Sequence, residues 1–132
     1  MTFLDTSGLV ALFDDRDAHH ASALKIWPRL RTNVAALVLT DLIVVETVNV
    51  LRSHAGWEVA RRAGQRLLSG AVAEVVFADA PIFEQAWRIF CKYDDHVLSL
   101  TDCVSFALMK ERSIRTAFSF DDDFRIAGFH FA

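Results

Sequence analysis

The uninterrupted apolar run from Val34 to Leu39 constrains the fold of this chain more than any other segment. Such a run between polar neighbours is typical of a strand with both faces buried, which requires helices on both sides of its sheet. The segment from Thr2 to Asp5 is a second, shorter run and predicts another buried strand. We therefore expect a sheet that is covered on both faces.

Helical patterns alternate with the predicted strands along the chain. After a short helix that ends at Phe13 and a polar break over 14–17, the predicted helices cover residues 18–31, 40–54, 58–68, 81–93 and 102–112. Further strands are predicted over residues 71–78, 116–120 and 128–131. Because helical connections between neighbouring strands make those strands parallel, we expect an α/β fold with a short, mostly parallel sheet.

Length and composition point to one globular domain over residues 1–132. Hydrophobic residues make up 53% of the chain and charged residues 23%, which suits a substantial core. We predict neither a secretory signal nor a membrane span, because Asp5 interrupts the first apolar run and no stretch reaches the roughly 18 apolar residues required. Cys91 and Cys103 lack metal-binding or redox spacing, so we expect buried thiols in a soluble, cytoplasmic protein.

Four acidic residues lie where a carboxylate has little local compensation. Asp5 ends the first apolar run, Glu46 interrupts an apolar helix, and Asp102 follows a short apolar stretch. Asp121 opens an acidic triplet, and no Lys or Arg lies within four residues of Asp5, Glu46 or Asp102. Burying a carboxylate is costly without compensation, so a bound cation is one way to stabilise these positions.

Each of these acids also has an ordinary structural explanation. Asp5 can cap a helix, Asp102 can favour the first turn of one, and Asp121 can belong to a turn. Glu46 cannot cap a helix from its middle, but it can belong to a solvent-facing polar strip with Asn49.

Their shared position in the predicted fold is the stronger argument. Asp5 and Asp121 follow strands, and Asp102 begins a helix on the same side, so these carboxylates are expected to meet at the carboxyl edge of the sheet. Carboxylates held close together at neutral pH require a proton or a cation. Oxygen ligands without His or Cys suit Mg²⁺ or Mn²⁺.

With these residues in view, the chain resembles the PIN-domain ribonucleases, and especially the short VapC-type toxins of prokaryotic toxin–antitoxin pairs. The resemblance spans essentially the whole chain. It rests, in order, on Phe3-Leu4-Asp5-Thr6-Ser7, Glu46 followed by Val50-Leu51-Arg52, Leu100-Thr101-Asp102 with Ser105, and Phe118-Ser119-Phe120-Asp121-Asp122-Asp123-Phe124 leading to Gly128-Phe129. It implies a three-layer α/β/α sandwich and metal-dependent cleavage of RNA.

The resemblance also assigns the site. Asp5, Glu46, Asp102 and Asp121 are the implied catalytic acids, and these four with Asp123 are the implied ligands of Mg²⁺ or Mn²⁺. Asp5 and Asp102 would be the central ligands, and Glu46 would orient the attacking water. Whether Asp121, Asp123 or both face the metal stays open at this point.

Other polar residues near the motifs receive more modest expectations. The neighbouring Asp122 is expected to face solvent, and for the hydroxyls of Thr6, Ser7 and Ser105 ordinary helix capping is the preferred interpretation. His19 and the adjacent His20 are expected to be surface histidines, because neighbouring helical residues point in different directions.

The implied partners are an RNA substrate, an antitoxin protein that covers the active-site groove and a second copy of the chain, with no membrane partner. The net charge of −3 means that RNA binding needs local basic patches or bound cations. The basic side chains considered for such patches are Arg61, Arg62, Arg66, Lys110, Arg112 and Arg115.

Two alternatives stay open. A magnesium-dependent phosphatase or receiver domain also has aspartates at strand ends, but Ser7 stands where such a phosphatase needs a second Asp, and Asp121 stands near where a receiver needs Lys. A PIN-like binding module without activity would be expected to have lost at least one of the four acids.

Overall fold

Five short strands form the centre of the computed structural model, which describes residues 1–132. The strands are β1 (Thr2–Leu4), β2 (Leu37–Thr40), β3 (Glu74–Val76), β4 (Thr116–Phe118) and β5 (His130–Phe131). They pair in the order β3-β2-β1-β4-β5, and every pairing is parallel. The predicted, mostly parallel sheet is therefore confirmed, and it is parallel throughout.

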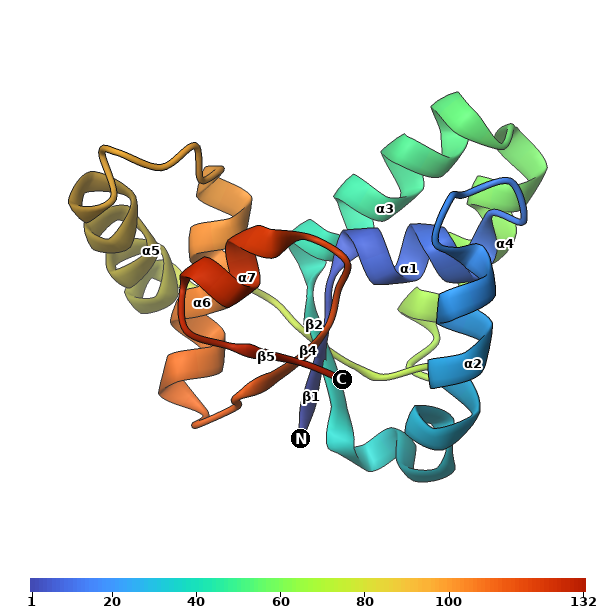
Figure 1. Ribbon diagram of the computed structural model, residues 1–132, viewed down its shortest axis with the longest axis horizontal. Coiled ribbons are helices and arrows are strands. Elements are labelled where there is room, and N and C mark those ends of the chain that lie inside the picture. The colour runs from blue at the N-terminus through green and yellow to red at the C-terminus, as the bar shows by residue number, and fades with distance from the viewer.

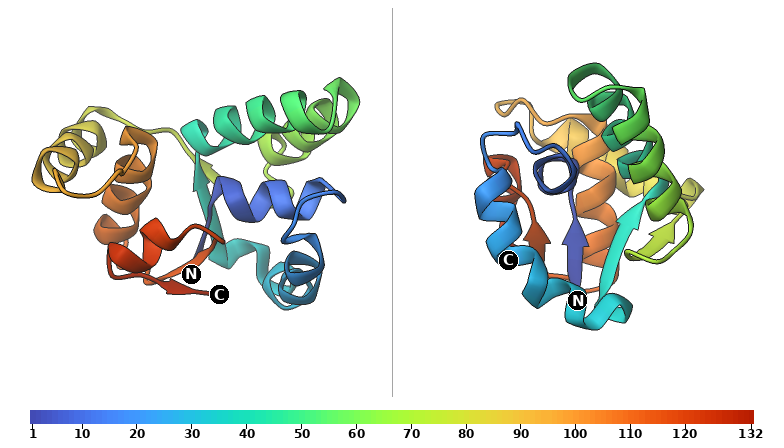
Figure 2. Two further views of the ribbon diagram at one scale, coloured as in Figure 1. Left: turned by 45° about the horizontal axis from the view of Figure 1, so that its top comes forward. Right: turned by 90° about the vertical axis from the view of Figure 1, so that its right-hand side faces the viewer.

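Helices cover both faces of this sheet (Figures 1 and 2). One layer contains α1 (Thr6–Phe13), α2 (His20–Leu30), α3 (Asp41–His54) and α4 (Trp57–Leu68). The other contains α5 (Ala80–Lys92) and α6 (Leu100–Glu111), with the short α7 (Asp122–Ile126) beside them. The arrangement is the three-layer α/β/α sandwich that the resemblance implies, and no helix is both long and apolar enough to cross a bilayer.

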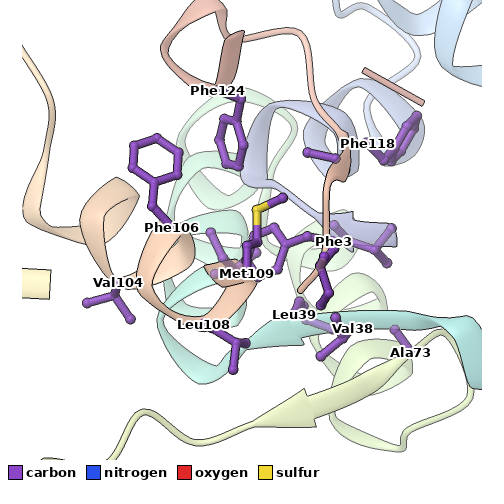
Figure 3. Packing of buried hydrophobic residues seen from close by; sticks show 14 of the residues in the cluster. Phe3, Val38, Leu39, Ala73, Val104, Phe106, Leu108, Met109, Phe118 and Phe124 are labelled. Atoms are coloured by element: carbon purple, nitrogen blue, oxygen red, sulfur yellow. The ribbon is translucent and has the colours of Figure 1, made fainter. Parts of the chain in front are cut away.

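The main core contains side chains from both helical layers, and Figure 3 shows the part of it between the sheet, α6 and α7. The rings of Phe106 and Phe124 meet edge to face with their centroids 5.0 Å apart, and Phe3 of β1 lies 6.2 Å from Phe124. Full burial of a Phe side chain contributes about 2 kcal/mol to stability. The buried ring of Phe124 therefore fixes α7 against the core, and with it the acidic residues that begin this helix.

The strand predicted over Val34–Leu39 is displaced along the chain. Residues Arg31–Ala36 form a 3₁₀ helix, η1, and β2 begins only at Leu37. Thr2, the first residue of β1, pairs with Leu37, so the residues before Leu37 have no strand beside them. Val34, which the sequence predicts to be buried, is 36% exposed.

Other differences occur at the ends of elements. The segment 71–78 forms a strand only at β3, and the predicted strands 116–120 and 128–131 shorten to β4 and β5. The helix α7 is not predicted, because its acidic start is equally typical of a turn. The helix predicted from Asp102 begins at Leu100. Both thiols are free, but Cys91 is exposed rather than buried.

Candidate active site

All four predicted catalytic acids line one open pocket of about 560 Å³. Asp5 follows β1 directly, and Asp121 lies just beyond β4, so the pocket lies at the carboxyl edge of the sheet. Its remaining lining consists of Thr6, Ser7, Val10, Asp17, His19, Val50, His54, Phe120 and Asp122. The predicted meeting of carboxylates from distant segments is therefore observed.

Asp5 forms the buried floor of this cluster, with only 3% of its surface exposed. It caps α1, and its Oδ2 accepts hydrogen bonds from the Ser7 hydroxyl at 2.7 Å and the Ser119 hydroxyl at 2.8 Å. Burial raises the pKa of Asp5 above its ordinary value, while these hydrogen bonds act in the opposite direction. The carboxylate is thus positioned by two serine hydroxyls, and no Lys or Arg contacts it.

The two serines connect the ends of β1 and β4. The Ser7 hydroxyl accepts from the backbone N–H of Phe120 at 2.9 Å, and the Ser119 hydroxyl accepts from that of Asp121 at 3.0 Å. For Ser7, therefore, the capping interpretation is wrong, because its hydroxyl orients the carboxylate of Asp5. Ser119 has no assigned role in the sequence interpretation, and its position directly after a buried strand is the only signal that could have indicated one.

Asp102 approaches the cluster from the first turn of α6. Ser99 caps this helix, and the backbone N–H of Asp102 donates to its hydroxyl at 3.0 Å. Desolvation, reinforced by the nearby charges of Asp5 and Asp121, raises the pKa of Asp102 to about 7. At neutral pH this group is near the midpoint of its titration when no cation is bound.

Asp121 and Asp123 reach the same point from the start of α7. Carboxylate oxygens of Asp102, Asp121 and Asp123 all lie within 4.8 Å of one another. Desolvation and the neighbouring charge of Asp121 raise the pKa of Asp123. Both residues that the sequence left as alternatives thus lie beside Asp102, whereas Asp122 is exposed at the pocket rim.

Glu46 enters the pocket from the opposite wall, on α3. Val50 and His54 line the pocket with it, at spacings that bring them to the same face of the helix. Asn49 is exposed and does not line the pocket. The predicted solvent-facing strip of Glu46 and Asn49 is therefore not observed, because Glu46 lines the pocket and Asn49 does not.

The other predicted hydroxyls behave differently from Ser7. Ser105 donates to the backbone oxygen of Thr101 at 3.3 Å within α6. The hydroxyl of Thr6 is buried beside the pocket without a hydrogen-bond partner. Neither makes a helix-capping contact.

The arginines and the lysine considered for RNA binding do not line this pocket. Arg61 and Arg62 both bind Glu58, at 2.6 and 3.1 Å, and Arg112 binds Glu74 at 2.8 Å. The expected basic rim is therefore not found at the acidic pocket. Its lining contains no Lys or Arg, and imidazoles are its only side chains that can carry positive charge.

Sequence interpretation missed the histidine and aromatic part of the site. His19 is a surface residue, as predicted, but its ring lies on that of Phe120 with centroids 4.6 Å apart and planes 3° from parallel. Asp17 adds a further acid at this side of the pocket. Their loop position carries no periodic signal that could have indicated this role.

The chemistry of the donor set fits a divalent metal ion. Three carboxylates lie within reach of one ion, and burial, together with the nearby charges of Asp5 and Asp121, raises the pKa of Asp102. Carboxylate oxygens are preferred by Mg²⁺ and Mn²⁺, and the lining lacks the thiolates that favour zinc. A cation here would stabilise the ionised carboxylates and could bind the oxygens of a phosphodiester.

Comparison with known families and structures identifies the fold independently. The family described as PIN domain matches residues 2–129. The crystal structure of Mycobacterium tuberculosis VapC20, described as a sarcin–ricin loop cleaving toxin, superposes with a TM-score of 0.90 at 30% identity. The superposition covers 98% of this chain and 96% of that chain.

Two curated relatives cover most of the chain. The 23S rRNA-specific endonuclease VapC20 of Mycobacterium tuberculosis is 33% identical over 129 residues, which are 98% of this chain and 95% of that protein. Ribonuclease VapC26 of the same organism is 30% identical over 118 residues, which are 89% of this chain and 84% of that protein. The similarity to VapC20 and the family match over residues 2–129 thus include the segments that carry the acidic pocket.

Proposed function

This chain belongs to the PIN-domain family, among its VapC-type ribonucleases, and on that premise we propose that it is a metal-dependent endoribonuclease toxin. The observation that carries the proposal is the cluster of Asp102, Asp121 and Asp123 beside the buried carboxylate of Asp5. We propose that these acids hold Mg²⁺ or Mn²⁺ within a single nuclease domain spanning residues 1–132.

Each acid has a distinct part in this proposal. A divalent cation bound there supplies the positive charge that the phosphate oxygens and an attacking water need in an acidic pocket. Asp5, held by two serine hydroxyls, keeps a fixed carboxylate at the floor, and Asp102 contributes a second central carboxylate once it loses its proton. Glu46 faces the pocket from α3, where its carboxylate would accept a hydrogen bond from the attacking water. The expected products carry 5′-phosphate and 3′-hydroxyl ends.

We propose a loop of ribosomal RNA as the first substrate to test. Both the sequence similarity and the superposition lead to VapC20, whose descriptions name 23S rRNA and the sarcin–ricin loop. Single-stranded loops suit this pocket because their unpaired bases are accessible, unlike the paired and stacked bases of a regular RNA helix.

The proposal also includes protein partners. A nuclease toxin acts on cytoplasmic RNA and requires inhibition, so we propose an antitoxin that covers the acidic pocket and a homodimer as the free form. Several large apolar side chains are exposed, among them Trp57, Phe77 and Trp87, and such side chains are suited to protein contacts.

The decisive experiment uses purified protein and a sarcin–ricin stem-loop RNA, with Mg²⁺, with Mn²⁺ and with EDTA. Asp102→Asn removes one proposed ligand with little change in volume. Asp95→Asn, in an exposed loop outside the pocket, is the matched control. We expect cleavage that requires metal, disappears with Asp102→Asn and persists with Asp95→Asn.

Cleavage that survives EDTA, or is equal in wild type and Asp102→Asn, would contradict the proposal. Mn²⁺ binding measured by calorimetry then separates two explanations. Binding without cleavage indicates a different RNA substrate, and no binding indicates an inactive PIN-like module.

A further inference from the structure

Two flat rings from different segments of the chain line the acidic pocket together. They are the ring of Phe120 and the imidazole of His19, which lies parallel to it at a centroid distance of 4.6 Å. This pair lies next to the metal-binding acids, because Phe120 directly precedes Asp121. We refer to it as the His19–Phe120 stack.

The inner member of the stack is firmly positioned. The backbone N–H of Phe120 donates to the Ser7 hydroxyl at 2.9 Å, and the same hydroxyl donates to Asp5. The ring of Phe120 also meets that of Phe118 edge to face at 6.1 Å. The hydrogen bonds that position the carboxylate of Asp5 therefore also position this ring.

The outer member of the stack is open to solvent. His19 is an exposed residue, and its imidazole lies parallel to the ring of Phe120. Its backbone N–H donates to the carboxylate of Asp17 at 2.8 Å, which anchors the loop before α2. A flat, accessible imidazole at a fixed site is suited to contact with another flat ring.

The charge of the pocket favours such a contact. The lining contains no Lys or Arg, and its acids repel phosphate except where a cation is bound. Contacts that do not depend on Lys or Arg can therefore contribute to RNA affinity within this pocket. Stacking of unpaired bases on Phe or His is the usual contact of this kind.

Resting on the proposed function, we propose that the His19–Phe120 stack is the base-stacking platform of this site. One unpaired base of the substrate, beside the phosphodiester that is cut, lies on the accessible face of His19 and extends the stack. The platform would thereby hold the bond to be cut over the acidic cluster. His19 is a substrate-binding residue in this proposal, and Phe120 positions it.

The test is a thermodynamic cycle between a residue and a base. The background is Glu46→Gln, which is expected to bind RNA without cutting it, with saturating Mg²⁺. Dissociation constants are measured by fluorescence anisotropy for a sarcin–ricin stem-loop, intact or with an abasic nucleotide at one loop position at a time. The variants are His19→Ala and His19→Phe, with His130→Ala as an exposed control outside the pocket.

If the platform exists, there is one loop position at which the effects of His19→Ala and of base removal on binding free energy are not additive. His19→Ala should weaken binding of intact RNA roughly 5- to 100-fold, the range expected for loss of one stacked base. At the abasic position the same substitution should have almost no effect. His19→Phe should retain near-wild-type affinity, because it keeps a flat ring without an imidazolium charge.

Three results would overturn the platform. The first is an equal effect of His19→Ala on the affinity for every RNA, and the second is no binding of RNA at all. The third is near-wild-type affinity in His19→Lys but not in His19→Phe, which would indicate a contact with phosphate. Thermal unfolding of each variant verifies that His19→Ala is folded.

The same measurements distinguish failure of the platform from failure of the proposed nuclease function. If wild type cleaves RNA and His19→Ala leaves KM unchanged, only the platform fails. If wild type binds RNA through His19 but never cleaves it, only the nuclease proposal fails.

Discussion

At the scale of single residues, we expect the protonation of Asp102 to determine how well the site binds a cation. Its pKa of about 7 results from burial and from the charges of Asp5 and Asp121. A cation can bind the ionised form but competes with a proton for the carboxylate. We therefore expect Mn²⁺ affinity and the cleavage rate to fall as pH decreases through about 7, from pH 8 to pH 6.

Isothermal titration of Mn²⁺ at several pH values provides the measurement. Binding at pH 6 should release close to one more proton than binding at pH 8, because Asp102 is then largely protonated in the free protein. A Mn²⁺ affinity that is the same at pH 6 and pH 8 would contradict this role for Asp102.

The same shifts predict an unusual dependence of stability on pH. Asp5, Asp102 and Asp123 all have raised pKa values in the folded state, so the unfolded chain binds fewer protons between about pH 4 and pH 7. Stability without metal therefore decreases as pH rises through this window. In EDTA at pH 8, we expect Asp102→Asn to raise the free energy of unfolding by about 1–2 kcal/mol, a discounted value because the carboxyl is partly exposed.

Urea unfolding of wild type and Asp102→Asn, at pH 5 and pH 8 in EDTA, checks this expectation. The stabilisation should be smaller at pH 5, where the Asp102 carboxyl is protonated in the folded protein. Equal stabilisation at both pH values would show that the charge of Asp102 is not its source.

Ser119 is a second residue whose contribution to the site can be tested, because its hydroxyl donates to the buried Oδ2 of Asp5 at 2.8 Å. Ser119→Ala removes this hydrogen bond and leaves the carboxylate less stabilised. We expect a loss of about 1–2 kcal/mol in stability and a loss of about 10- to 100-fold in Mn²⁺ affinity. Ser53→Ala, at an exposed position of α3, is the control and should change neither quantity.

At the scale of elements, the approach of α1 to β4 brings Asp5 and Ser119 together. Gly8 allows this approach, because a Cβ at this position would lie 2.3 Å from the backbone oxygen of Phe118. That oxygen also accepts the backbone N–H of Asp5 at 3.1 Å. A side chain at Gly8 would therefore push apart the two elements that build the floor of the site.

Gly8→Ala should lower the free energy of unfolding by about 2–3 kcal/mol and reduce cleavage as well. Gly64→Ala is a useful contrast, since the added Cβ would meet only the side chain of Val48, at 3.1 Å. Thermal unfolding and cleavage of both variants provide the measurement. A Gly8→Ala protein as stable and active as wild type would refute the steric argument.

At the scale of the whole molecule, metal binding should stabilise the complete fold. The acids lie on segments far apart in sequence, and the unfolded chain does not bring them together. A ligand that binds only the folded protein at 100 times its Kd adds about 2.7 kcal/mol. We expect Mn²⁺ to raise Tm at pH 8, to raise it less at pH 6, and to have little effect on Asp102→Asn; an equal rise in that variant would contradict the proposed ligands.

The fold class, and the placement of Asp5, Glu46, Asp102 and Asp121 in one pocket, could be predicted from the sequence alone. The apolar strands, the caps at Asp5 and Thr40 and the amphipathic helices are local patterns, and they predicted a parallel sheet between helical layers. Because parallel strands end at one edge, the same pattern predicted that Asp5 and Asp121 would meet. Their function as metal ligands remains a prediction.

Tertiary structure alone decided how the pocket is supported and what lies beside the acids. The shift of β2 to Leu37 depends on pairing with β1, and the contact of Ser119 with Asp5 joins residues 114 positions apart. The parallel rings of His19 and Phe120 likewise join two loops. Such contacts depend on how distant segments pack, and no local pattern of hydrophobicity or propensity encodes them, whereas strands and helices arise from residues close together in the chain.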